Sequence, residues 1–181
     1  MLLDISGTKV EDSGMIVQRL VAKDSSSSLA RPLVVNGVNV TEIVDLFETL
    51  GYECQVGAEL VGASGVAHPF DIIAKKGVEF IVMDLMAFRS SILDTPSSDY
   101  EISDMLTKSV LLMRIKSWDC KPTQRIILHL SSYLCNEDQE LSQHDPVRGF
   151  LSQFDIKLIK SANMEQATRK LKSFLCEVEI S

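Results

Sequence analysis

The chain has 181 residues, 45% of them hydrophobic, and its 18 basic and 25 acidic side chains give a formal net charge of −7. This length and composition favour one α/β domain with an appendage and argue against disordered and fibrous classes. No apolar run approaches the roughly 20 residues that a membrane helix requires. An acidic chain is also a poor general ligand for polyanions such as DNA.

The chain start and the cysteines indicate a cytoplasmic protein. The stretch Met1 to Asp4 lacks the basic start and apolar run of a signal peptide. The cysteines are far apart and form no CxxC pair, so we expect free thiols rather than disulfides or a zinc site. They are Cys54, Cys120, Cys135 and Cys176.

Composition divides the chain into two parts. Residues 1–35 are predicted to be an N-terminal extension, because 23–31 is a serine-rich linker that cannot build a core. The apolar stretch 15–22 before it suits a strand or a helix equally well. Residues 36–181 are predicted to form the folded domain.

Hydrophobic periodicity predicts the elements of that domain in chain order. A first helix begins at Thr41, a plausible N-cap, and ends at Gly51, whose type suits a C-cap. The further predictions are strands at 52–60, 70–74 and 78–85, a helix at 103–118, a strand at 125–130, helices at 137–143 and 147–154, a strand at 156–159 and a helix at 162–175.

This order defines the fold class. Three strands joined by short turns form an antiparallel meander, whereas later strands that return through helices add in parallel. The sequence therefore predicts an α/β fold, a three-layer α/β/α sandwich with a mixed central sheet.

Two aspartates on neighbouring strands are candidate metal ligands. Asp71 and Asp84 flank the hairpin turn at 75–77, so antiparallel pairing brings them to the same end of the two strands. Two such carboxylates can share Mg²⁺ or Mn²⁺, which polarises a phosphate and lowers the pKa of the attacking water. A purely structural alternative also fits, in which Asp71 caps a turn and Asp84 pairs with a Lys or Arg.

Three stretches, 41–52 (TEIVDLFETLGY), 69–77 (PFDIIAKKG) and 81–86 (IVMDLM), resemble the PD-(D/E)XK nuclease superfamily. The resemblance is closest to archaeal Holliday junction resolvases and Mrr-type endonucleases, and it covers about residues 40–90. It implies a restriction endonuclease-like core and metal-dependent cleavage of DNA.

Matching the motifs residue by residue assigns Asp71 as the metal-binding Asp and Asp84 as the acid of (D/E)xK. Glu42 best matches the helix acid, and Asp45 and Glu48 are less favoured. The resemblance thus implies Asp71, Asp84 and Glu42 as both catalytic residues and metal ligands.

The motif departs from the family at Met86, which stands where the family has its Lys. That Lys orients the attacking water and stabilises developing negative charge, and a thioether does neither. Lys75 and Lys76 lie at the far end of the hairpin, so Lys108 on the following helix is the better substitute.

Charge distribution bears on activity. Residues 36–104 hold three basic and twelve acidic side chains, a net charge of −9, which supports an acid cluster but weakens the case that the protein cuts nucleic acid. The sequence therefore favours a catalytically degenerate nuclease-like protein that binds DNA or a protein partner. The alternatives are an active Mg²⁺- or Mn²⁺-dependent DNA endonuclease with a relocated Lys, and a regulatory oligomerisation module such as a homodimer.

The remaining noticeable residues have structural explanations. His68 and His144 are expected in a loop and a turn, His129 in a buried strand, and Trp118 in helix packing. Two basic helix faces are solvated by default and are the only surfaces suited to nucleic acid phosphates. They are Lys108/Arg114/Lys116 and Arg169/Lys170/Lys172.

Overall fold

The structure is a computed structural model that describes residues 33–87, 99–130 and 146–178. Several sequence predictions therefore lie outside the described residues. They are the apolar stretch 15–22, the serine-rich linker 23–31, the helix at 137–143, Cys135 and His144.

From α1 onward, the described elements follow the predicted order, and two short strands that the sequence did not predict precede it. The strands are β1 (Val34–Val35), β2 (Val38–Asn39), β3 (Glu53–Val61), β4 (Ala67–Lys76), β5 (Glu79–Ala87), β6 (Gln124–Leu130) and β7 (Lys157–Ser161). The helices are α1 (Thr41–Thr49), α2 (Asp99–Cys120), α3 (Pro146–Gln153) and α4 (Met164–Val178).

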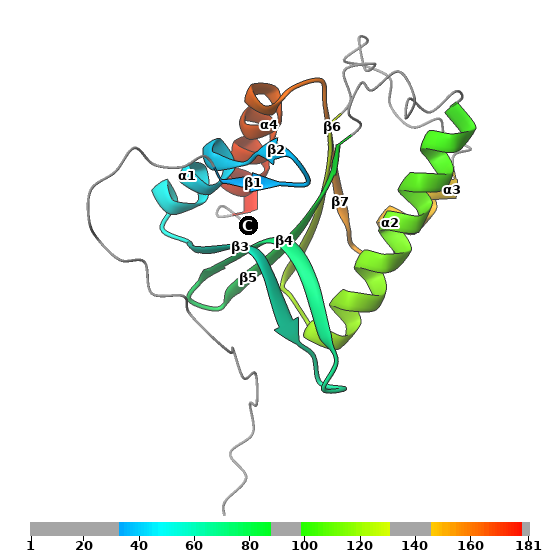
Figure 1. Ribbon diagram of the computed structural model, residues 1–181, viewed down its shortest axis with the longest axis horizontal. Helices are drawn as coiled ribbons and strands as arrows, with labels where there is room; N and C mark the ends of the chain where they lie inside the picture. The colour runs from blue at the N-terminus through cyan, green and yellow to red at the C-terminus, as the bar shows by residue number, and fades with distance from the viewer. Residues whose placement is uncertain (1–32, 88–98, 131–145, 179–181) are drawn as a thin grey trace, which may run out of the picture.

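The predicted fold class is confirmed. One five-stranded sheet has the order β3-β4-β5-β6-β7, with antiparallel pairing from β3 to β5 and parallel pairing from β5 to β7. Helices α1 and α4 cover one face of this sheet, and α2 and α3 cover the other (Figure 1). The result is a three-layer α/β/α sandwich around a mixed sheet.

Each face of the sheet has its own apolar core. The core under α1 and α4, here the α1–α4 core, includes Phe47, Met83 and Leu171. The core under α2 and α3, here the α2–α3 core, includes Phe70, Val82 and Met113. Successive side chains of β5 pack alternately in the two cores, so the strand is buried on both faces, as the sequence predicted for a central strand.

Helix α1 ends as predicted but begins differently. Gly51 has φ +85°, and Tyr52 N–H donates to Phe47 O at 2.9 Å, the Schellman arrangement. The predicted N-cap was wrong: Val40 is the cap residue, and no side chain caps the helix. The Thr41 hydroxyl instead accepts a hydrogen bond from Leu33 N–H at 3.1 Å, which joins the helix start to the residue just before β1.

A small hairpin precedes α1. Strands β1 and β2 pair antiparallel across Asn36 and Gly37, whose φ values of +50° and +74° suit a type I′ turn. Val35 is buried in the α1–α4 core. The folded unit thus includes Leu33 to Val35, just before the predicted domain start at residue 36.

Helix α2 buries only one stripe. Leu106, Val110 and Met113 recur at helical spacing and pack in the α2–α3 core. The expectation that Trp118 packs was wrong, because its side chain is 74% exposed. Leu112 and Ile115 are also more than half exposed, so α2 carries a second apolar stripe on its outer side.

Candidate active site

Asp71 and Asp84 occupy opposite register positions where two strands separate. The β4–β5 ladder ends at Ile72 and Met83, and Asp71 and Asp84 occupy the next register position. Beyond it, β4 continues to pair with β3, and β5 continues to pair with β6. Both aspartates therefore lie inside their strands, not at the shared strand end that the sequence predicted, because each strand keeps its outer neighbour after losing the inner one.

The β3–β4 hairpin changes sides at this same position. Even-numbered side chains before Gly57 and after Asp71 pack in the α1–α4 core, whereas even-numbered side chains on the far side of these two residues in the hairpin pack in the α2–α3 core. Gly57 lies opposite Asp71 in register and has φ +60°, which favours glycine. The first set is Tyr52, Cys54, Val56, Ile72 and Ala74, and the second is Ala58, Leu60 and Phe70.

Where the β4–β5 ladder stops, the Asp71 carboxylate accepts the hydrogen bond that a backbone carbonyl of a pairing strand would otherwise accept. Leu85 N–H donates to Asp71 Oδ2 at 2.6 Å. Asn36 Nδ2, in the turn of the small hairpin, lies 3.3 Å from both carboxylate oxygens. Asp71 therefore joins β4, β5 and the β1–β2 hairpin at one point.

Charge at this point is unfavourable for an anion. Burial is the main cause that raises the pKa of Asp71, and the neighbouring Asp84 carboxylate raises it further. The Leu85 amide, Lys116 and Asn36 act in the opposite direction. A cation bound between the two aspartates would relieve the repulsion that remains.

A lysine completes the group of charges. Lys116 on α2 forms an ion pair with Asp84 Oδ2, and its Nζ donates to Pro69 O at 2.8 Å. The ammonium also lies 4.5 Å from the centre of the Phe70 ring. The two side chains of the pair are only 16% and 21% exposed, so solvent screens their attraction weakly.

Lys116, rather than Lys108, is the lysine at the acid pair. Lys108 binds Asp104 one turn away on the same helix, at 2.6 Å. Lys75 and Lys76 lie over the rings of Phe80 and Tyr52, at the other end of the hairpin. Lys116 follows Met113 by three positions, so it stands at the edge of the buried stripe of α2 that faces the sheet.

Glu42 does not join the two aspartates in a metal-binding group. Within residues 33–87, 99–130 and 146–178, no three or more His, Cys, Asp or Glu side chains gather closely enough to hold an ion. Glu42, Asp45 and Glu48 lie on the solvent-exposed side of α1, because that helix turns its apolar face to the sheet. Asn36, which the sequence analysis did not single out, is the residue that reaches Asp71 from this side.

A second polar cluster fastens the hairpin to α2. The Asp119 carboxylate accepts hydrogen bonds from Ser64 N–H at 2.8 Å and from the Ser64 hydroxyl, and it contacts His68 Nε2 at 2.7 Å. Those bonds, with the Ser64 hydroxyl first, lower the pKa of Asp119 to about 2. Ala63 N–H also donates to Asp119 O at 3.1 Å. His68 thus lies on β4 rather than in the predicted loop.

This Asp119 cluster has a positioning role. In a nucleophilic triad the histidine contacts the serine, but here Ser64 and His68 both bind the same carboxylate. Asp119 lies one turn beyond Lys116 on α2, so the cluster fixes the helix end that carries the lysine. Gly62 is required nearby, because a Cβ there would lie 2.0 Å from Asp119 Oδ2.

The donor set suits a hard divalent cation in an open site. Mg²⁺ in phosphate-processing sites is commonly held by one or two carboxylates, with waters and substrate phosphate filling the other positions. Asp71 and Asp84 supply two carboxylates. Burial and, to a smaller extent, the Asp84 charge raise the pKa of Asp71, and the repulsion between the two carboxylates favours a cation there.

Comparisons with known proteins add little. No protein-family profile and no curated protein matches the chain. Among solved structures, the protein of unknown function AF1548 is 16% identical with a TM-score of 0.44, over 68% of this chain and 57% of its own. An XisH family protein from Nostoc punctiforme is 15% identical with a TM-score of 0.38, over 70% of this chain and 91% of its own. Likenesses this low carry no functional argument.

The helices and cysteines of residues 33–87, 99–130 and 146–178 bear on membrane insertion and on disulfide formation. None of the helices in these ranges is long and apolar enough to cross a membrane. Cys54, Cys120 and Cys176 are free cysteines.

Proposed function

We propose that this protein is a metal-dependent phosphodiesterase acting on DNA, with Asp71 and Asp84 as ligands of Mg²⁺ or Mn²⁺ and Lys116 as the relocated catalytic lysine. The observation that carries the proposal is the ion pair between Lys116 and Asp84 beside Asp71. With Met86 in the motif, β5 supplies no lysine to the acid pair. Lys116 supplies one from α2 instead.

The three side chains have distinct tasks in this proposal. Asp71 and Asp84 hold the metal, which supplies polarisation of the phosphate and activation of water when it is bound. Lys116 changes partners between Asp84 and the substrate phosphate, and its ammonium stabilises charge that develops on the phosphoryl oxygens. Asn36 and the Leu85 amide keep the Asp71 carboxylate in place.

Cleavage of linear and branched DNA in Mg²⁺ or Mn²⁺ tests the proposal. We expect Asp84→Asn and Lys116→Met each to lower the cleavage rate about 100-fold or more, the loss typical of a removed transition-state contact. Lys108→Met is the matched control, because it removes a lysine from the same helix that pairs with Asp104; it should cleave normally.

The same ion pair would also exist if Asp84 had only a structural role. A folded wild-type protein that cleaves no DNA with either metal would therefore defeat the proposal. Salt-sensitive DNA binding without cleavage would then support the catalytically degenerate form that the sequence favoured.

A specific observation favours one second candidate, an oligomerisation module. Leu112, Ile115 and Trp118 form the outer apolar stripe of α2, with 58%, 60% and 74% of their surfaces exposed. Exposed apolar patches of this kind mark protein interaction sites. Light scattering should then show a homodimer that Ile115→Ser with Trp118→Ser dissociates, whereas Val78→Ser, at an exposed valine in the β4–β5 turn, leaves the mass unchanged.

A further inference from the structure

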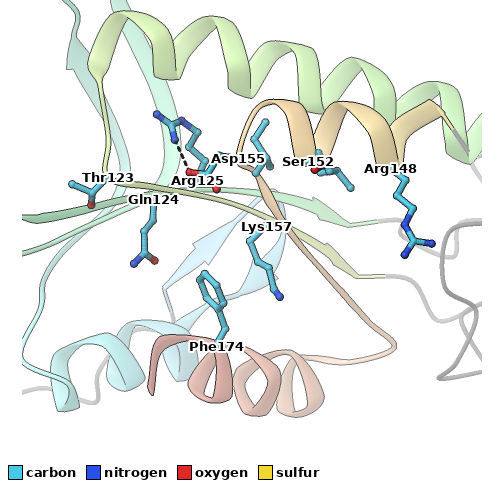
Figure 2. A pocket seen from close by; sticks show the side chains of 10 residues that line it. Thr123, Gln124, Arg125, Arg148, Ser152, Asp155, Lys157 and Phe174 are labelled. Atoms are coloured by element: carbon cyan, nitrogen blue, oxygen red, sulfur yellow. Dashed lines mark ion pairs between the residues drawn. The ribbon is translucent and has the colours of Figure 1, made fainter. Parts of the chain in front are cut away.

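The cavity between the starts of β6 and β7 and helices α3 and α4 does not gather its charged side chains at one point. Its volume is about 420 Å³, and Arg125, Arg148 and Lys157 are among its lining residues. Figure 2 shows Arg125 on the α2 side of the sheet, Lys157 on the α4 side, and Arg148 directed away from the other two. No single ligand can therefore meet all three cations. The polar groups that converge lie instead at Asp71.

Three elements bring polar groups to the Asp71 carboxylate on β4. Besides the Leu85 amide of β5, Asn36 extends from the turn of the β1–β2 hairpin, and its Nδ2 lies 3.3 Å from Asp71 Oδ1 and 3.3 Å from Asp71 Oδ2. Both contacts are longer than the range of about 2.7–3.2 Å that is usual for N–H···O bonds. The Asn36 amide therefore lies equally far from the two carboxylate oxygens, in a close hydrogen bond to neither.

This spacing resembles that between two ligands of one metal ion. Mg²⁺ binds oxygen at about 2.1 Å in near-octahedral geometry, which places adjacent ligand oxygens roughly 3.0 Å apart. An asparagine also carries a carbonyl oxygen, and a half-turn about the Cβ–Cγ bond, which is a soft torsion, exchanges Oδ1 and Nδ2. The half-turn brings Asn36 Oδ1 to about the place of Nδ2, at a ligand-to-ligand distance from Asp71.

The hairpin holds the Asn36 backbone but leaves the side chain open. Val35 is buried in the α1–α4 core, and Val40 N–H donates to Leu33 O at 2.8 Å at the base of the hairpin. The side chain of Asn36 is exposed, so a cation can reach it from solvent. A ligand on a backbone that is already fixed suits metal binding, because little has to be ordered when the ion arrives.

We propose that Asn36 is a third ligand of the metal ion, through Oδ1, alongside Asp71 and Asp84. This inference rests on the proposed function, because it assigns a ligand to the same metal. It supplies the third oxygen that the sequence analysis expected from Glu42, which lies on the exposed side of α1. A neutral amide provides this oxygen without placing another negative charge beside two carboxylates.

Calorimetric titration of the full chain with Mn²⁺, in the absence of DNA, tests the assignment through metal affinity rather than cleavage. Asn36→Gly removes the side chain and keeps the turn, because glycine readily adopts the φ of +50° found at this position. We expect this variant to bind Mn²⁺ about tenfold more weakly or worse, since loss of even an outer partner of a metal ligand costs about 10- to 100-fold in affinity.

Asn36→Asp distinguishes a metal ligand from a hydrogen-bond donor that only orients Asp71. Aspartate also tolerates a left-handed φ, and its carboxylate binds metal but has no N–H to donate. A ligand at position 36 should therefore let this variant bind Mn²⁺ at least as tightly as the wild type. Asn39→Asp is the matched control, because it adds the same charge to the same hairpin, opposite Val34, and keeps an oxygen for Thr41 N–H; it should bind like the wild type.

Three results would overturn the assignment of Asn36 alone. Weaker binding in both Asn36 variants would make the side chain a donor that orients Asp71. Unchanged or tighter binding in Asn36→Gly would mean that the amide contributes no ligand or competes with the metal for Asp71. Equal tightening in Asn36→Asp and Asn39→Asp would show only general attraction between charges.

The failure of the proposed function gives a different result. A folded wild-type protein that binds no Mn²⁺ at millimolar concentration would defeat the nuclease proposal and the Asn36 ligand together. A wild-type protein that binds Mn²⁺, loses the binding in Asp84→Asn and keeps it in Asn36→Gly would retain the metal site and reject only the third ligand.

Discussion

Lys116 on α2 forms an ion pair with Asp84 on β5, 32 positions earlier in the chain, at the point where β4 and β5 separate. The same lysine binds the Pro69 carbonyl and lies over the Phe70 ring, so it links helix α2 to both strands of the gap. Stability and the proposed chemistry therefore depend on the same side chain.

Loss of this ion pair should cost stability. Lys116→Met leaves Asp84 without its counter-charge and close to Asp71, and we expect unfolding free energy to fall by about 2 kcal/mol, somewhat less than for a fully buried pair. Urea denaturation measures it. The double variant Lys116→Met with Asp84→Asn should recover part of the loss, since the unpaired charge is gone. Additive losses in that double variant would contradict this account.

Alanine substitutions at two glycines, one beside the Asp119 cluster and one on α3, should change the stability of the protein in opposite directions. Gly62→Ala places a Cβ against the Asp119 carboxylate and should destabilise the protein by about 2 kcal/mol through overpacking. Gly149→Ala on α3 meets nothing within 4 Å and should stabilise it by up to about 1 kcal/mol. Thermal unfolding of both variants measures the direction of each change in stability. A Gly62→Ala variant as stable as the wild type would contradict the overpacking, because it would show that the Asp119 carboxylate moves aside at little cost.

Asn36 should influence the pKa of the neighbouring Asp71 carboxyl group. Asn36→Gly keeps the turn but removes the amide contacts that lower the pKa of Asp71, so this pKa should rise further. Titration of the Asp71 carboxyl by NMR measures the shift. Asn36→Ala should have the same effect on the pKa and should cost about 1 kcal/mol more in stability, because alanine resists the left-handed φ of +50°. An unchanged Asp71 pKa in both variants would contradict the contact.

Buried His129 predicts a dependence of stability on pH. Burial, with a smaller effect of Lys160, lowers its pKa from 6.5 to about 4 in the folded state. The stabilisation is therefore complete above pH 6.5 and is lost as pH falls towards 4, on the order of 3 kcal/mol, because the unfolded chain takes up the proton first. Urea denaturation from pH 7 to 4.5 measures this slope. His129→Gln should flatten it, and a persisting slope would assign the effect to other groups.

Asp119 predicts a second transition at lower pH. Its pKa of about 2 lies below the ordinary value of 3.8, so its contribution is present above pH 3.8 and is lost as pH falls through about 2. Asp119→Asn should remove this part of the acid dependence, measured by near-ultraviolet circular dichroism between pH 4 and 2. An identical acid curve in that variant would mean that the cluster contributes nothing to stability.

Local pattern determined the elements around the site. The strong apolar period of α4, the alternation and turn chemistry of the β4–β5 hairpin, and the glycine that ends α1 act within a few residues, so the sequence predicted them correctly. The order of these elements also determined the mixed sheet, because short turns force antiparallel neighbours and helices allow parallel ones. The placement of Asp71 opposite Asp84 followed from the same local register.

Other features depended on how distant elements pack. Met86 in the motif suggested a lost lysine, and only the docking of α2 on the sheet showed that Lys116 reaches Asp84 while Lys108 does not. The contact of Asn36 with Asp71 depends on where the β1–β2 hairpin lies over the sheet, and the exposure of Trp118 depends on which stripe of α2 faces inward. Sequence periodicity predicts which residues share a helix face or a strand edge. Contacts between elements tens of residues apart depend instead on how whole helix faces pack on the sheet.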